Sequence, residues 1–258
     1  MRHAALVPAL LFLTPVMGDT FAQERKVDPL PAVELAVNLE RLKQRLEELP
    51  ESDEERSLLF TGDFKLGPSA TSEPAELPQA DILVMESTFG QPRYELPPRV
   101  EVIGELIALV RRTLAAERTP VIHAYALGKS QEVTKLLTTA GIPVVQHPMV
   151  YAVSEIYAAC GVDLGQVARY AGEIPAGHAV VTLPRGMMGY RLAGIDQPVS
   201  IAVTGWAVDP GTRHRQKVDH ALPLSDHADF NELVEAAERV GAQAIYCTHG
   251  PRECAEHL

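Results

Sequence analysis

The chain has 258 residues, of which 34 are acidic and 23 basic, so its formal net charge is −11. This balance argues against a broad basic face for nucleic acid but is compatible with a local basic groove. Hydrophobic residues make up 46% of the chain, as in an ordinary globular protein, and the length suits one large or two modest domains. Three cysteines at distant positions predict free thiols and a reducing compartment.

The first 22 residues argue against a reducing compartment. A basic start is followed by an apolar run over residues 4–17 and by small residues ahead of Gln23, which is the layout of a secretory signal. The run is too short and too rich in proline to predict a membrane span. Two interpretations fit: a functional signal peptide, or unrelated sequence translated from a wrongly placed start codon.

Residues 31–50 have a helical pattern, in which leucines recur at alternating steps of four and three along positions 35–49. Such a stripe serves either as a docking surface for self-association or a partner, or as the inner face of a helix packed on its own domain. The acidic run over 51–55 predicts a solvated linker, so residues 23–53 are expected to form a separate helix-and-linker segment.

Polar side chains follow three short apolar runs. Asp63 follows the run 57–60, Glu86 ends the run 81–85, and His249 follows the run 245–248, while His227 lies in the loop before an amphipathic helix. Because ligands and catalytic groups gather at the carboxyl ends of strands in α/β sheets, we expect these four groups to converge on one sheet edge.

The interval between these runs alternates between strand and helix patterns. Strands are predicted at 120–125, 142–146, 179–183 and 199–204, and helices at 100–114, 130–139 and 150–160. This alternation with short loops predicts a mostly parallel sheet covered on both faces.

Four short motifs occur in order along the chain: Thr61-Gly62-Asp63-Phe64, Glu86-Ser87-Thr88-Phe89-Gly90, Ser225-Asp226-His227-Ala228-Asp229 and Thr248-His249-Gly250. Together they resemble the successive motifs of the β-CASP nucleases of the metallo-β-lactamase fold, such as ligase-associated DNA exonucleases and RNA 3′-end processing nucleases. The resemblance implies an α/β chain with an incomplete metallo-β-lactamase-like αββα half at 54–95 and 222–258. A mostly parallel β-CASP cassette is then inserted at 96–221.

The resemblance also implies a chemistry, namely phosphodiester hydrolysis assisted by two zinc ions. Asp63 resembles the metal-bridging aspartate and His249 a zinc ligand. His227 resembles the histidine that contacts the scissile phosphate or assists the leaving group, and Glu86 the acid that orients it. The alternative interpretation is that Glu86 and His227 only hydrogen-bond to each other and have a structural role.

Three further features concern nucleic acid. Gly128-Lys129-Ser130 lacks the first glycine of a P-loop, which argues against an ATP site. The loop opens a helix, so either Lys129 and Ser130 contact a phosphate there or Gly128 only provides the turn. Arg213 and Arg215 belong to a short basic cluster that either contacts phosphate, which we favour, or forms a solvated turn. Trp206 either stacks on a base or, as we favour from the sequence, belongs to the core.

The sequence departs from the family in one respect. None of its nine histidines forms a His-x-His pair, so the His-x-His-x-Asp-His metal motif is missing. Asp63 and His249 alone are too few for a zinc site, which needs at least three protein ligands. We therefore expect a truncated relative that does not hydrolyse nucleic acid alone; the alternative is a non-catalytic module that binds nucleic acid or protein. The family implies a cytoplasmic location, and a functional signal peptide would imply export.

Overall fold

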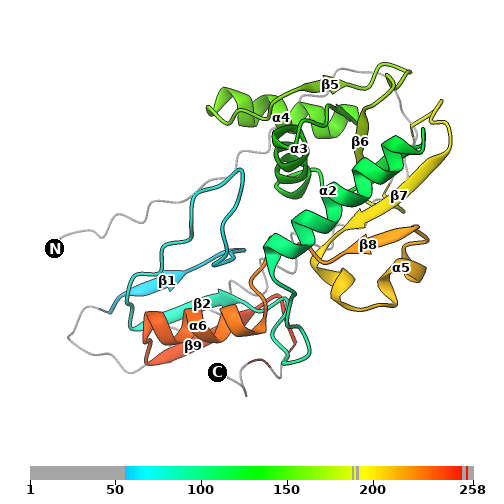
Figure 1. Ribbon diagram of the computed structural model, residues 1–258. Helices are drawn as coiled ribbons and strands as arrows, with labels where there is room; N and C mark the ends of the chain where they lie inside the picture. Colours follow the sequence, from blue (N-terminus) through cyan, green and yellow to red (C-terminus); the bar gives the residue numbers. More distant parts are fainter. Residues whose placement is uncertain (1–55, 188, 190–191, 252–253, 255–258) are drawn as a thin grey trace, which may run out of the picture. The chain divides into compact units, whose positions relative to one another are not determined.

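The computed structural model of the chain describes residues 56–187, 189, 192–251 and 254 (Figure 1). The signal-like segment, the leucine-striped helix with its association surface, and the acidic linker lie outside these residues. Within the described part, none of the helices combines the length and apolar character needed to cross a membrane.

The larger of the two sheets has six strands in the order β5-β4-β6-β3-β7-β8, and every strand pair in it is parallel. The strands are β3 (Thr119–His123), β4 (Val144–Gln146), β5 (Val167–Arg169), β6 (Ala179–Thr182), β7 (Pro198–Val203) and β8 (His220–Leu222). Consecutive residues of the central strands are buried, as expected for parallel strands that are covered on both faces.

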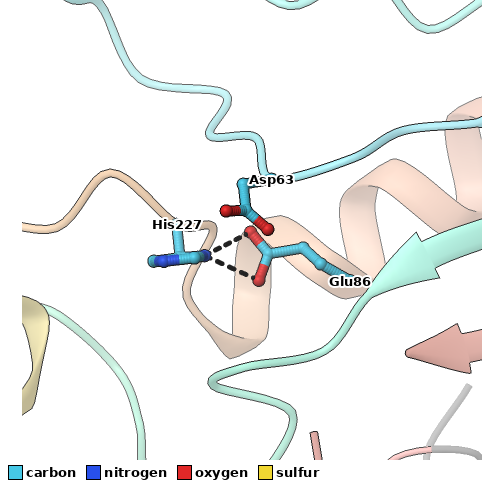
Figure 2. A group of neighbouring side chains, drawn as sticks. All are labelled: Asp63, Glu86 and His227. Carbon is cyan, nitrogen blue, oxygen red and sulfur yellow. Dashed lines mark hydrogen bonds and ion pairs between the residues drawn. The ribbon is translucent and has the colours of Figure 1, made fainter. Parts of the chain in front are cut away.

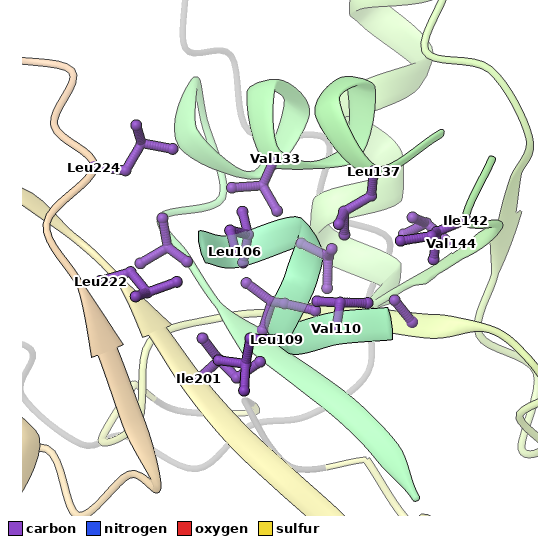
Figure 3. Packing of buried hydrophobic residues seen from close by; sticks show 14 of the residues in the cluster. Leu106, Leu109, Val110, Val133, Leu137, Ile142, Val144, Ile201, Leu222 and Leu224 are labelled. Atoms are coloured by element: carbon purple, nitrogen blue, oxygen red, sulfur yellow. The ribbon is translucent and has the colours of Figure 1, made fainter. Parts of the chain in front are cut away.

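Helices α2 (Arg99–Ala115), α3 (Lys129–Thr139) and α4 (Pro148–Ala159) contribute to the core of this sheet. Leu106, Val110 and Leu137 are fully buried against Ile201 and its neighbours on the sheet (Figure 3). Two shorter elements follow β7, the 3₁₀ helix η1 (Gly205–Val208) and α5 (Thr212–Arg215).

The smaller sheet has three parallel strands in the order β1-β2-β9, which are β1 (Leu58–Phe60), β2 (Ile82–Glu86) and β9 (Ala244–Thr248). Helix α6 (Phe230–Val240) packs Leu233 and Ala236 on Leu83 and Met85 of β2. The sequence sets both ends of this helix. The Asp229 side chain accepts a hydrogen bond from the third helical residue, and the chain turns out of the helix at a left-handed Gly241.

The structure confirms an α/β protein with parallel sheets. Each strand predicted within the described residues is present, and the expected helices occur within one or two residues of their predicted ends. The sequence analysis missed β5, β8, η1 and α5, which have three to four residues each and show no clear periodicity. Strand β1 is an edge strand, and its Leu58 and Phe60 side chains are 46% and 53% exposed.

Candidate active site

Three of the four polar groups predicted at the sheet edge meet in the structure. Glu86 is the last residue of the buried strand β2, and Asp63 follows the edge strand β1 after Gly62, whose φ of 60° turns the chain. His227 comes from the loop that enters α6. Ligand atoms of Asp63, Glu86 and His227 all lie within 4.8 Å of one another (Figure 2).

Glu86 and His227 form the closest contact in this group. The carboxylate of Glu86 is 1% exposed, and both of its oxygens lie 2.9 Å from Nδ1 of His227. The same carboxylate accepts backbone hydrogen bonds from Phe64 and Thr88, at 3.2 and 3.3 Å. Glu86 is therefore held by donors on three sides, and its charge faces the imidazole.

The imidazole of His227 is held at its backbone as well as at its ring. The Ser225 hydroxyl accepts a hydrogen bond from the His227 amide at 2.9 Å and donates one to the His227 carbonyl at 2.8 Å. Burial lowers the pKa of His227, but the hydrogen bond and negative charge of Glu86 outweigh it and raise this pKa above its usual 6.5. Because Nδ1 faces Glu86, the second ring nitrogen Nε2 is the atom left for an anionic ligand, and the side chain is 32% exposed.

A pocket of about 200 Å³ adjoins His227. Its walls include the cationic side chains of Lys65 and Arg99, and also the carboxylates of Asp229 and Glu232. The Arg99 guanidinium donates to the Ser225 carbonyl at 3.0 Å, which ties the start of α2 to the His227 loop.

A buried ionic cluster lies beside this loop. Its anion is Glu132 on α3, 1% exposed, which is paired with Lys65, Lys129 and Arg99. Asp226, the residue before His227, accepts hydrogen bonds from the Lys129 ammonium at 2.7 Å and from the Lys65 ammonium at 3.3 Å. The cluster thus joins α3, the loop after β1 and the loop that carries His227.

Lys129 and Ser130 do not lie where a phosphate contact, one of the two interpretations of the sequence, would need them. Lys129 is 2% exposed with its ammonium paired to Asp226, and Ser130 is fully buried beside the Ala124 carbonyl. Neither side chain is accessible to a phosphate in this conformation. An ammonium can bind an internal carboxylate as readily as an external phosphate, and the sequence does not distinguish the two.

The two arginines of α5 lie on the surface, as a contact with phosphate would require. Arg213 and Arg215 are both exposed, and Arg215 pairs with Asp209 at 2.8 Å. Trp206 on the adjoining η1 is 41% exposed, so the interpretation of this tryptophan as a core residue was wrong.

The chain is similar in sequence to several known proteins. The chain is 36% identical over 202 residues to a probable DNA ligase of Opitutus terrae, covering 78% of this chain and 20% of that protein. It is 28% identical over 183 residues to the 5′ exonuclease Apollo of Gallus gallus, covering 69% of this chain and 37% of that protein. It is also 31% identical over 84 residues to an RNase J-like protein of Methanocaldococcus jannaschii, covering 32% and 20% of the two chains.

The chain belongs to the β-CASP nucleases of the metallo-β-lactamase fold. No protein-family model matches it. The chain spans about a fifth to two fifths of the length of these relatives, since it covers 20%, 37% and 20% of them.

The β-CASP resemblance implies two zinc ions, and the described residues do not fit that pair. Asp63, Glu86 and His227 offer three donor groups, but Glu86 already accepts from two backbone amides and from His227. His249, predicted to be a zinc ligand, is exposed, adopts a φ of 57° and is absent from this group of neighbouring donors. Two zinc ions need more nitrogen and oxygen ligands than the described residues bring together.

Proposed function

We propose that this chain binds nucleic acid at Asp63, Glu86 and His227, as the phosphodiester-recognising part of a β-CASP nuclease site, and that it does not hydrolyse nucleic acid alone. The Glu86–His227 pair carries the proposal. A fully buried carboxylate at 2.9 Å from Nδ1 fixes the tautomer and the direction of an imidazole whose other nitrogen is left for a ligand.

The chemistry of this pair suits a phosphate. With its pKa raised by Glu86, His227 is more often protonated near neutral pH than a free histidine, and Nε2–H can donate to a phosphate oxygen or to a leaving group. Asp63 lies within 4.8 Å of the pair, and its negative charge, like that of Glu86, favours the protonated form of His227.

Hydrolysis in this family depends on zinc, whose role would be to activate water and neutralise phosphate charge. The donors near Asp63 do not complete a two-zinc site, so we assign no hydrolytic step to this chain. Binding without turnover is the function that the remaining groups support.

We assign the six-stranded sheet to the inserted cassette over 96–221 and the three-stranded sheet to the metallo-β-lactamase-like part over 54–95 and 222–258. Strand β9 returns from the far end of the sequence to pair with β2, with Glu86 opposite Thr248, which supports a discontinuous domain. The exposed Leu58 and Phe60 on edge strand β1 support the view that this smaller sheet is incomplete.

The same edge favours a second candidate, a protein-binding module. A partner strand could pair with β1 and cover Leu58 and Phe60. Three free thiols, Cys160, Cys247 and Cys254, support a reducing compartment for either function.

Binding is tested by fluorescence anisotropy with an end-labelled single-stranded oligonucleotide in the presence of a chelator. We expect binding to persist without metal and His227→Gln to weaken it about tenfold, the scale of one charge-assisted hydrogen bond. His178→Gln is the matched control, because His178 is a partly exposed histidine directly before β6 and does not belong to the group around Asp63. Absence of binding, or equal losses in the two variants, would overturn the proposal.

A further inference from the structure

An aromatic cluster adjoins the candidate active site without belonging to it. Phe89 packs edge-on to His227, with ring centroids 6.2 Å apart, and lies 4.8 Å from the ring of Trp206. Tyr94 meets Trp206 at 5.8 Å with an interplanar angle of 89°. Phe89 is 1% exposed, whereas Trp206 is 41% exposed, so the cluster begins in the core beside His227 and ends on the surface.

The backbone fixes the indole in this position. A Cβ on Gly205 would lie 2.6 Å from the ring of Phe89 and 2.8 Å from the Ser225 hydroxyl, so only glycine lets η1 close on Phe89 here. The Trp206 carbonyl accepts a hydrogen bond from the Thr212 hydroxyl at 2.6 Å, which attaches η1 to α5. The backbone that carries the indole is therefore fixed at two points, and part of the ring stays in water.

Arginines occur on one ring of the aromatic cluster and on the helix that follows Trp206. Arg93 lies over the Tyr94 ring at 4.8 Å and donates to the Tyr94 hydroxyl at 3.0 Å. Arg213 and Arg215 extend from α5, which follows η1 directly. Asp209 offsets part of this charge through its pair with Arg215, but Arg213 makes no ion pair among the described residues. In a chain of net charge −11, an exposed ring with arginines on the neighbouring elements is suited to an anionic ligand with a flat face.

We propose that Trp206, supported by Tyr94 and Phe89, is a stacking platform for one unpaired base of the nucleic acid whose phosphate is bound at His227. This inference rests on the proposed function and deepens it, because it makes single-stranded nucleic acid the substrate class. A base in a duplex has its faces covered by neighbouring bases, whereas an unpaired base can place one face on the indole. One ring, Phe89, separates Trp206 from His227, so a short stretch of one strand could reach both.

Stacking on an aromatic ring is tolerant of sequence, because every base has a π face. The platform therefore predicts preference for unpaired over paired strands, with little preference among bases. In this arrangement Trp206 is a positioning residue: it holds the strand, while Nε2 of His227 faces the phosphate.

The test uses the fluorescence of Trp206, the only tryptophan in the chain. The full chain in chelator is titrated with oligothymidylate, with an abasic oligomer of the same length and charge, and with a duplex. We expect oligothymidylate to quench the indole and to bind at least about fivefold more tightly than the abasic oligomer, as one stacked base would give. The duplex should bind more weakly and quench less.

Variants separate stacking from folding. Trp206→Leu should lose most of the preference for oligothymidylate over the abasic oligomer, measured with labelled oligomers, and Trp206→Phe should keep much of it. Met149→Ala is the matched control, since Met149 is 56% exposed on α4, which packs near β5 at the opposite edge of the six-stranded sheet from β8. Unchanged melting temperatures would show that the variants fold.

The outcomes distinguish this inference from the proposed function. Equal binding of oligothymidylate and abasic oligomer, without quenching, would overturn the platform and leave the His227 phosphate site standing. Duplex binding as tight as that of the single strand would overturn the unpaired-base assignment. Failure to bind any of the three probes would overturn both proposals.

Discussion

Replacing Glu132 with glutamine should destabilise the protein, because Glu132 is the buried anion on which three cations converge. Its carboxylate is 1% exposed and accepts from Lys65 at 3.2 Å, from Lys129 at 3.4 Å, and from Arg99. The substitution keeps the shape of the side chain but removes its charge and directs an NH₂ group toward cationic donors. Breaking a buried ion pair costs roughly 3–5 kcal/mol. Since Asp226 still pairs with Lys129, we expect the lower end, about 3 kcal/mol.

The free energy of unfolding is measured by urea denaturation at pH 7, with the melting temperature as a second reading. A loss of about 3 kcal/mol corresponds to a decrease of roughly 6–12 °C for a domain of this size. Glu235→Gln is the matched control, since Glu235 forms only an exposed pair with Arg239 on α6 and should change stability by less than about 0.5 kcal/mol. A loss below about 1 kcal/mol for Glu132→Gln would refute the reasoning.

The pH dependence gives an independent check. Burial raises the pKa of Glu132, but the charges of Lys129 and Arg99 outweigh it and hold this pKa well below its usual 4.5. The contribution of Glu132 is therefore fully present above pH 4.5 and is lost as the pH falls further. The stability difference between wild type and variant should shrink below pH 4.5, and a difference that grows there would contradict the assignment.

Three further predictions concern the core, the backbone and the site. Leu106→Ala removes a fully buried side chain of α2 and should cost roughly 2–5 kcal/mol in urea unfolding. Gly205→Ala places a methyl group 2.6 Å from an aromatic ring and should cost roughly 1–3 kcal/mol, whereas Gly104→Ala meets nothing within 4 Å in its helix and should add up to about 1 kcal/mol. Glu86→Gln should lower the pKa of His227, followed by NMR titration in chelator, because the charge that raises it is gone.

Much of the fold could be predicted from hydrophobic pattern alone. Runs such as 82–85 and 199–203 are apolar without alternation, which indicates strands covered on both faces, and both are buried parallel strands. Strand-end position also predicted that Asp63 and Glu86 lie close together, because parallel strands deliver their carboxyl ends to one edge of a sheet. The same reasoning failed for His249, which does not join them.

Exposure and pairing of individual side chains could not be predicted in the same way. Lys129 resembled a phosphate ligand at a helix start, yet its ammonium is paired with Asp226, which is 97 residues away in the sequence. Trp206 resembled a core residue, yet it is 41% exposed, because the steric fit of Gly205 against Phe89 decides where η1 lies. Such contacts join segments that are distant in the sequence, so local sequence patterns do not predict them.

The most direct test of the central claim is the length of a labelled single-stranded oligonucleotide after incubation with excess protein and zinc, under conditions in which anisotropy shows it to be bound. We predict that the bound oligonucleotide stays intact, because the described residues do not complete a two-zinc site around Asp63. Shortening of the oligonucleotide that disappears in Asp63→Ala would contradict this prediction and would show that the chain forms a working nuclease site.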